Sequence, residues 1–293
     1  MGFFLVMKAE LVRSFIIMRR YWFATLMGII IGYFVLLTLI YGFMRSGGDT
    51  GDAPSVATEV GTALESRAAD RGFAVNATES AIGFMLGMFA FGIVGLFTAG
   101  LQGMARTGEL EQVCLSPHGL VTNFLARSFV ASVSSILTWC ILLVLISRTV
   151  KSELFLDIGP LVALLFLTYF NLIGFGFMMG GLVLVFKQTG QVAMIIRLAF
   201  IGIPLFVSEK IYEWDVASNP FLLIVRGGLH VIPSADAAIC LKMVLVGGEG
   251  FGIFAHPSFF WLICNGVFWT GLGIACFKYL ENWSRQKGTL GAY

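Results

Sequence analysis

Few residues of this sequence are of a type and spacing that could carry out chemistry. The three histidines, His118, His230 and His256, lie far apart and fall in predicted loops. The sequence contains no G-x-x-x-x-G-K-S/T phosphate-binding loop, no H-E-x-x-H zinc motif and no G-x-S-x-G nucleophile motif. We therefore predict no catalytic centre, no resident metal or cofactor, and no ATP site of the phosphate-loop type in this chain.

The five cysteines indicate neither a disulfide framework nor a metal site. Their number is odd and no C-x-x-C pair occurs. Free cysteine behaves as a small apolar side chain, so we expect these residues to fill space between helices. They are Cys114, Cys140, Cys240, Cys264 and Cys276.

Polar side chains are rare in the apolar runs of the sequence. Arg197 is the only charged residue in the six longest runs, and it lies near the end of its run, where it can snorkel to the interface. We expect Asn171 and Asn265 to hydrogen-bond neighbouring helices rather than a substrate. A proton- or ion-coupled carrier usually has acidic residues at mid-membrane, and these runs have none.

The composition explains this scarcity, because the chain is strongly apolar. Of its 293 residues, 58% are hydrophobic and 12% are charged, and the mean hydropathy is +0.88. Soluble proteins carry roughly 25% charged residues, so a soluble globular domain is excluded. The net charge of +2 gives no reason to expect nucleic-acid binding. We predict an all-α polytopic membrane protein in which residues 1–293 form a single transmembrane domain.

Six apolar runs are candidates for membrane spans, since a helix needs about 20 apolar residues to cross a bilayer. The run at 192–208 is the shortest and contains Arg197. The run at 158–186 is longer than required and should tilt or kink. The predicted spans are 21–44, 81–105, 128–147, 158–186, 192–208 and 257–277.

Basic residues favour an orientation in which both termini and residues 106–127 are cytoplasmic. Arg19 and Arg20 flank the first span on one side, whereas Arg45 alone flanks it on the other. Basic residues are enriched on the cytoplasmic side of membrane proteins. We therefore predict a multi-pass protein of the cytoplasmic (inner) membrane, with residues 45–80 as a polar external loop.

Residues 1–20 have the pattern of a helix that lies in the membrane interface. Basic residues occupy other positions than the apolar ones, which is typical of such helices. The alternative is a ragged start to the first span. The apolar residues recur at steps of three and four, at Phe4, Met7, Leu11, Phe15 and Met18.

The internal segment 106–127 is the most informative stretch between spans. Glu109 to Leu115 can form two helical turns, and Pro117 then ends them because proline lacks a backbone N–H. A short helix tied to two spans at the membrane surface is a rigid lever, through which a soluble partner could push on the spans. The alternative is an ordinary loop that contains a short helix.

The segment 216–256 precedes the last span and contains two short apolar pieces, 221–225 and 237–246, the second of which carries Lys242. Both are too short to cross a membrane, and non-spanning backbone at membrane depth must be buried in protein or line a water-filled cavity. We predict a re-entrant hairpin that enters from outside; the alternative is a surface loop with two interfacial helices. The residues expected to break the apolar pieces are Pro220, Gly227, Gly228 and Pro233.

Two of these stretches resemble the membrane (permease) subunit of type-2 ABC exporters. The sequence T-G-E-L-E-Q-V-C-L-S-P at 107–117 is similar to the T-G-T-L-E-Q-L-x-x-S-P stretch that follows the second span in that family. Residues 218–229 resemble the segment that begins with N-P-L before the last span of the family. The resemblance covers most of the chain, although Glu109 stands where the family often has threonine or serine, and the 45–80 loop is longer than in polysaccharide exporters.

The resemblance implies a permease without an ATP site of its own. Two copies of a cytoplasmic ABC ATPase subunit would hold ATP and magnesium, and a second membrane subunit, identical or related, would complete the pathway. Residues 108–117 would be the coupling helix, whose apolar side chains Leu110, Val113 and Leu115 would fit a groove of the ATPase. The implied coupling residues are Gly108, Glu109, Leu110, Glu111, Gln112, Val113, Leu115, Ser116 and Pro117, and those of the re-entrant segment are Asn219, Pro220, Arg226, Gly227 and Gly228.

Two other classes of function stay open. A membrane-embedded enzyme acting on lipids would need a cluster of histidine and acidic residues near one interface, and the sequence suggests none that is compact. A passive channel or scaffold subunit would not change the ATPase rate of any partner. The sequence does not indicate the exported substrate.

Overall fold

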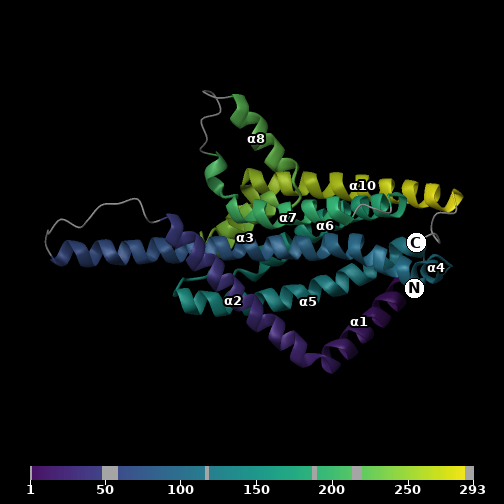
Figure 1. The fold of residues 1–293 in the computed structure, drawn as a ribbon. Coiled ribbons are helices and arrows are strands. Elements are labelled where there is room, and N and C mark those ends of the chain that lie inside the picture. The colour runs from purple at the N-terminus through teal and green to yellow at the C-terminus, as the bar shows by residue number, and fades with distance from the viewer. Residues whose placement is uncertain (1, 48–58, 116–118, 187–189, 213–219, 288–293) are drawn as a thin grey trace.

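All regular structure in the described part of the chain is helical in this computed structural model (Figure 1). The structure describes residues 2–47, 59–115, 119–186, 190–212 and 220–287. Five helices are long and apolar enough to cross a membrane, or six if one bent pair counts as a span, as in a polytopic membrane protein. The five are α2 (Trp22–Gly47), α3 (Glu59–Thr107), α5 (Gly119–Val150), α6 (Ile158–Val185) and α10 (Pro257–Gln286).

The remaining elements are shorter. Helix α7 (Gly190–Phe206) corresponds to the predicted span 192–208 and has 17 residues, fewer than any of the five long helices. The bent pair consists of α8 (Pro220–Val231) and α9 (Ala235–Leu245), which meet at 83°. The others are α1 (Gly2–Arg20), α4 (Glu109–Leu115) and two 3₁₀ turns, η1 (Glu209–Tyr212) and η2 (Gly250–Ala255).

Helices α3, α5 and α10 extend well beyond the predicted spans, α10 as far as Gln286. Helix α3 begins at Glu59, so the second half of the predicted 45–80 loop continues the span as helix. No proline interrupts this stretch, and alanine, glutamate and arginine within it favour helix. Helix α5 begins at Gly119 because Leu120 and Phe124 are buried in the core, which leaves little of the 106–127 segment as loop.

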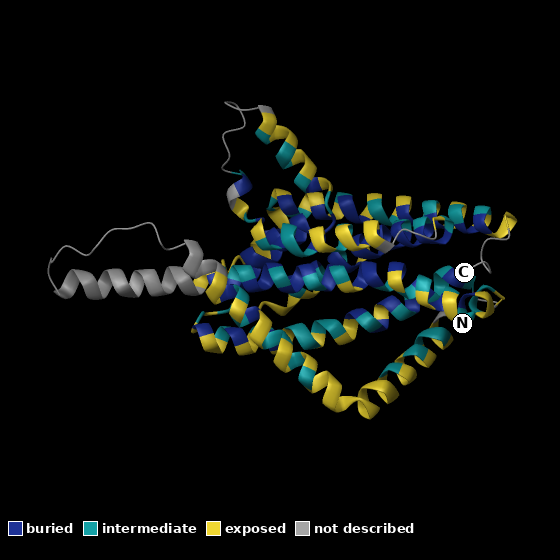
Figure 2. Ribbon diagram, in the orientation of Figure 1, coloured by how far each residue is buried: buried dark blue, intermediate teal, exposed yellow. Residues whose placement is uncertain are grey.

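The core lies between α3, α6, α7 and α10. Three phenylalanine rings connect α3, α6 and α10: Phe177 of α6 lies 4.6 Å from Phe97 of α3 and 5.2 Å from Phe277 of α10, centroid to centroid. Buried residues follow α3 and α6 in Figure 2, whereas α1 and α2 are mostly exposed. Helix α2 has a small core of its own, where Leu36 and Ile40 pack against α3 and α5.

Glycine allows two helix pairs in this core to approach closely. Gly174 of α6 and Gly273 of α10 face each other, and a Cβ atom on either would overlap the backbone of the other helix. A Cβ at Gly87 of α3 would lie 2.7 Å from Ile201 Cα of α7. Gly28 of α2, in contrast, has nothing within 4 Å, so its place in a G-x-x-x-G pattern has no packing role here.

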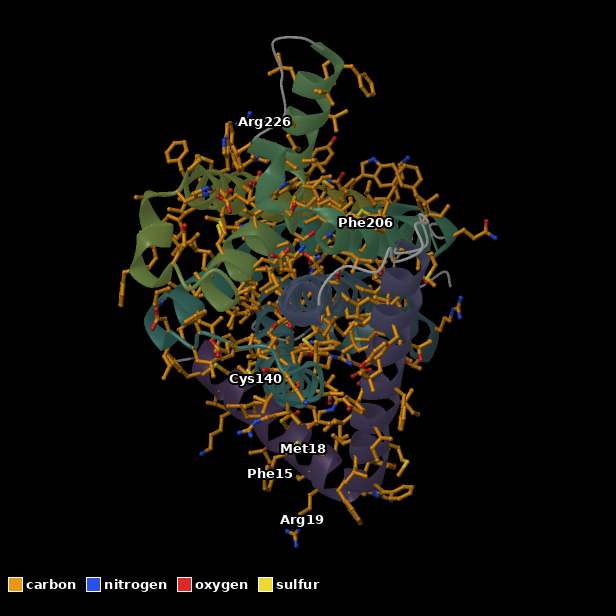
Figure 3. The ribbon with its side chains drawn as sticks, turned by 90° about the vertical axis from the view of Figure 1, so that its left-hand side faces the viewer. Phe15, Met18, Arg19, Cys140, Phe206 and Arg226 are labelled. Carbon is orange, nitrogen blue, oxygen red and sulfur yellow. The ribbon has the colours of Figure 1, made fainter. Side chains whose placement is uncertain are left out.

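The two ends of the helix bundle differ in what they carry (Figure 1). The start of α1, helix α4 and the end of α10 lie together at one end, which we call the α4 end. The connection from α5 to α6 and the pair α8–α9 lie toward the opposite end. The α1 helix and α2 form a V beside the bundle, and at its apex Phe15, Met18 and Arg19 point away from the other helices (Figure 3).

Candidate functional site

Helix α4 is held between two glycines with left-handed backbone. Gly108 has φ of +75° where α3 ends, and Gly119 has φ of +68° where α5 begins. Residues with a side chain seldom adopt this region, so glycine is favoured at both positions. The chain therefore leaves α3 sharply, makes the predicted short helix over Glu109–Leu115, and re-enters the bundle in α5.

One side of α4 is anchored in the protein's own core. Leu110 is 0% exposed and belongs to the main hydrophobic cluster, which also includes Phe124 of α5. The prediction that Leu110 contacts an ATPase groove is therefore wrong, because the side chain is already enclosed by α3 and α5. Val113 is half-buried against the same cluster.

The other side of α4 faces away from the bundle. Glu111 and Gln112 are exposed, and Leu115 is 86% exposed. This outward face of α4 therefore presents one carboxylate, one amide and one apolar side chain, none of which contributes to the core. Ser116 and Pro117, which the resemblance also assigns to coupling, lie outside the described residues.

Charged side chains from α1, α5 and α10 surround α4. Glu109 lines a small cleft of about 30 Å³ together with Glu10 and Arg13 of α1 and Arg127 of α5. On the other flank, Arg285 of α10 pairs with Glu281 at 2.6 Å. Burial raises the pKa of the Cys114 thiol, and Arg285 opposes this rise.

At the opposite end, the re-entrant residues do not all act as predicted. Pro220 is the first residue of α8, where proline is well tolerated. Gly227 and Gly228 lie inside α8 with open space around them, so the prediction that they break the segment is wrong. The bend falls at residues 232–234, which include Pro233. Asn219 lies outside the described residues.

The bend between α8 and α9 contains a buried pair that was not predicted from the sequence. His230 Nδ1 lies 2.8 Å from Asp236 Oδ1, and the two residues are 6% and 1% exposed. Asn265 of α10 donates a hydrogen bond to the His230 carbonyl oxygen. Trp269 Nε1 donates to the Val231 carbonyl oxygen at 2.9 Å. The last turn of α8, whose carbonyls have no partner within the helix, is thus fixed to α10.

Aromatic and polar groups of η1 and α10, together with His256 directly before α10, lie around this pair. The His230 ring stacks on Trp261 at 5.2 Å. The Tyr212 ring lies 5.7 Å from His230 and 5.3 Å from His256, and its hydroxyl is 2.8 Å from Ser258 Oγ. Burial raises the pKa of Tyr212. The prediction that His230 lies in a loop is wrong, because it belongs to α8. The sequence does contain a signal for the pair, namely an imidazole and a carboxylate on either side of Pro233 in an apolar segment.

Polar residues in the long helices behave partly as expected. Asn171 Nδ2 donates to the Leu262 carbonyl oxygen at 3.0 Å, and Asn265 also bonds a neighbouring helix, as predicted. Arg197 does not extend toward a helix end; its guanidinium lies 3.8 Å from the centre of the Phe91 ring, and Nε donates to the Phe91 carbonyl oxygen at 3.2 Å. Gly95 provides the space for this arginine.

Comparison with known proteins adds no relative to this picture. No family model, curated protein or solved structure matches the chain. Within the described residues, no group of three or more histidine, cysteine or acidic side chains could hold a metal ion. The geometry of the α4 end and of the α8–α9 bend is therefore the basis for any functional proposal.

Proposed function

We propose that this chain is the membrane subunit of a type-2 ABC exporter in the cytoplasmic membrane. In this proposal it pairs with a second membrane subunit and binds two copies of an ATPase subunit, which hold ATP and magnesium. The chain itself would not be an enzyme. The T-G-E-L-E-Q-V-C-L-S-P stretch of the sequence and the long apolar helices support this reading.

The observation that carries the proposal is the two-sided geometry of α4. Leu110 fixes the helix to α3 and α5, while Glu111, Gln112 and Leu115 face outward. A helix anchored in this way transmits a push to two long helices as a rigid body instead of bending. Its outward face carries the carboxylate and the apolar side chain that a basic, apolar-lined groove would bind.

The proposed topology places the α4 end in the cytoplasm, together with both termini. The pair α8–α9 would enter the membrane from the opposite side and return. Lys242 Nζ donates to the Val207 carbonyl oxygen at 2.5 Å, and Phe155 N donates to the Leu245 carbonyl oxygen at 3.0 Å. These bonds tie α9 to the end of α7 and to the α5–α6 connection, which supports a hairpin that opens toward the end opposite α4.

The exporter proposal is tested by charge changes on the exposed face of α4. Leu115→Arg and Glu111→Lys should each abolish co-purification of an ATPase and transport, because they place unpaired or like charge in the proposed interface. Both variants should insert and fold like the wild type. Ile158→Arg, at another strongly exposed apolar position but at the opposite end, is the control and should retain the ATPase.

Wild-type association and transport in both α4 variants would contradict the exporter proposal. A chain that co-purifies with an ATPase but does not change its rate of hydrolysis would instead favour a passive channel or scaffold subunit.

The His230–Asp236 pair favours a second candidate, a membrane-embedded enzyme acting on lipids. A carboxylate that holds an imidazole in one tautomer is the arrangement of a general base. Purified chain without any partner should then modify a lipid substrate, and His230→Gln should remove that activity while the fold is kept. Absence of lipid modification by the purified wild type, with lipids of the native membrane, would exclude this candidate.

A further inference from the structure

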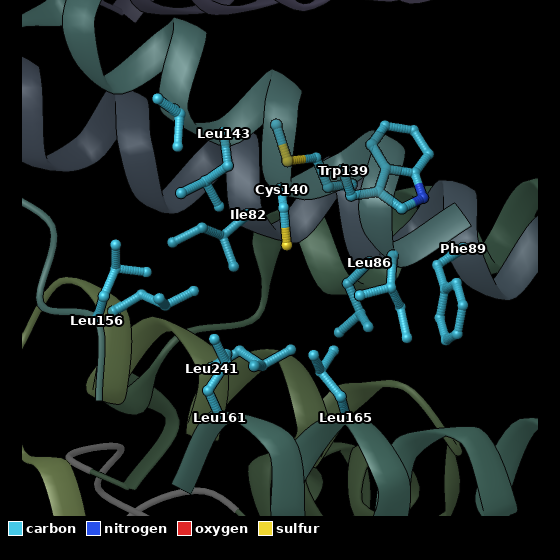
Figure 4. A pocket seen from close by; sticks show the side chains of 14 residues that line it. Ile82, Leu86, Phe89, Trp139, Cys140, Leu143, Leu156, Leu161, Leu165 and Leu241 are labelled. Atoms are coloured by element: carbon cyan, nitrogen blue, oxygen red, sulfur yellow. The ribbon is translucent and has the colours of Figure 1, made fainter. Parts of the chain in front are cut away.

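A cavity of about 320 Å³ lies between α3, α5, α6 and α9. Figure 4 shows side chains of α3 and α5, among them Leu86, Cys140 and Leu143, facing Leu165 of α6 and Leu241 of α9. The side chains that line it are aliphatic, aromatic or sulfur-containing, and none is charged. The cavity arises because α3 packs against both α5 and α6, while α5 and α6 scarcely touch each other.

The lining restricts the chemistry of an occupant. A polar ligand would lose hydrogen bonds to water without regaining them, and apolar cavities of this kind stay dry. The cavity is lined by three helices, α3, α5 and α6, that are long and apolar enough to cross a membrane, so in a bilayer it would face hydrocarbon rather than a soluble protein segment. An unbranched hydrocarbon chain from the bilayer satisfies both conditions.

The shape of the cavity also fits a chain. Its lining runs from Ile82 to Phe89 on α3 and from Ile136 to Val144 on α5. At 1.5 Å per helical residue, these stretches span roughly 10–12 Å along the helices. Cys140 is exposed and also lines the cavity, so it marks the side on which the cavity opens to the membrane.

A basic side chain lies where the headgroup of such a lipid would be. Cys140, Val144 and Arg148 follow at four-residue steps and therefore share one face of α5. Arg148 is exposed and lies in the last turn of α5, one turn beyond the cavity toward the polar end. A guanidinium at this position matches the geometry and charge of a phosphate.

We infer that this cavity binds one phospholipid of the bilayer, with an acyl chain between α5 and α6 and its phosphate against Arg148. The bound lipid fills the gap that α5 and α6 leave and holds the two helices at a fixed separation. This inference does not depend on the proposed exporter function, because it concerns a face of the bundle away from α4.

Photocrosslinking of the wild-type protein tests the position of the acyl chain. The protein is reconstituted in vesicles of phosphatidylglycerol that contain a phospholipid with a diazirine on its acyl chain, and crosslinked peptides are mapped by mass spectrometry. Crosslinks should concentrate on residues 136–144 and 161–165. Crosslinks spread evenly over the exposed faces of α2, α5 and α10 would overturn the inference.

Cavity-filling variants test occupancy independently. Cys140→Trp should lose the phospholipid that native mass spectrometry detects on the wild type, because the indole occupies the space of the chain. Ile141→Trp is the matched control: this neighbour is 48% exposed, does not line the cavity and should keep the lipid. Retention of the lipid by both variants would overturn the inference. If Cys140→Trp does not fold, the positions of the crosslinks on the wild-type protein are the test of the inference.

Charge variants test the headgroup contact. Arg148→Gln should weaken binding of phosphatidylglycerol about tenfold, the loss expected for one charge-assisted hydrogen bond of about 1.4 kcal/mol. Arg148→Lys should keep most of the affinity. A free fatty acid that binds as tightly as phosphatidylglycerol, with no effect of Arg148→Gln, would show that the phosphate contact is absent.

Discussion

Among single residues, those of the short helix α4 differ most clearly in burial: one side of the helix is anchored in the core and the other is exposed. Leu110 is enclosed by the core, whereas Leu115, five positions later, is almost fully exposed. Leu110→Ala should lower the free energy of unfolding by about 2–5 kcal/mol, since it leaves a cavity. Leu115→Ala should change it by no more than about 0.5 kcal/mol. Thermal unfolding in detergent measures both, and equal effects would contradict the anchoring role of Leu110.

The His230–Asp236 pair is the second prediction at this scale. Asp236→Ala should cost about 1–3 kcal/mol of stability, because it leaves the buried imidazole without its hydrogen-bond partner. Glu249→Ala removes an exposed carboxylate near the same end of the bundle and should have little effect. Unfolding midpoints of the two variants provide the comparison. An Asp236→Ala protein as stable as the Glu249→Ala control would mean that the pair does not hold the bend.

At the scale of elements, close backbone contact decides which helices pair. Gly273→Ala should separate α6 from α10, because the added methyl group would overlap the backbone of Gly174; a cost of about 1–3 kcal/mol is typical of overpacking. Gly271→Ala, two residues earlier in the same helix, has open space and is the control. Hydrogen exchange in α6 should increase only in the first variant. Equal hydrogen exchange in the Gly273→Ala and Gly271→Ala variants would contradict the close contact between α6 and α10.

At the scale of the whole molecule, the prediction concerns the two ends of the bundle. In a cysteine-free background, a cysteine at Gln112 should react with a membrane-impermeant maleimide only from the cytoplasm, and one at Glu249 only from outside. Both positions are exposed. Lys242 cannot serve as the outer reporter because it is buried and hydrogen-bonded. Labelling of both positions from the same side would contradict the proposed topology.

The positions of the long helices follow from local properties of the sequence. Whether a segment enters a membrane depends on the summed transfer free energy of its own residues, so the apolar runs at 21–44, 128–147 and 257–277 could be read locally. Helix α1 and the short helix at Glu109–Leu115 could also be predicted, from periodicity and from Pro117. The ends of the long helices could not be predicted in this way. Residues Glu59–Ser80 of α3, for example, include polar side chains that suit either a loop or a helical extension.

Which residues contact each other, in contrast, depends on how the helices pack. Periodicity identifies a face but not the helix that covers it, so the sequence could not show that Leu110 is buried and Leu115 is free. The G-x-x-x-G pattern occurs at both Gly28 and Gly83, yet only Gly83 lies against another backbone, that of α7. The His230–Asp236 pair likewise exists because the chain bends by 83° between α8 and α9. Contacts depend on the path of the backbone, whereas burial in a bilayer depends mainly on composition.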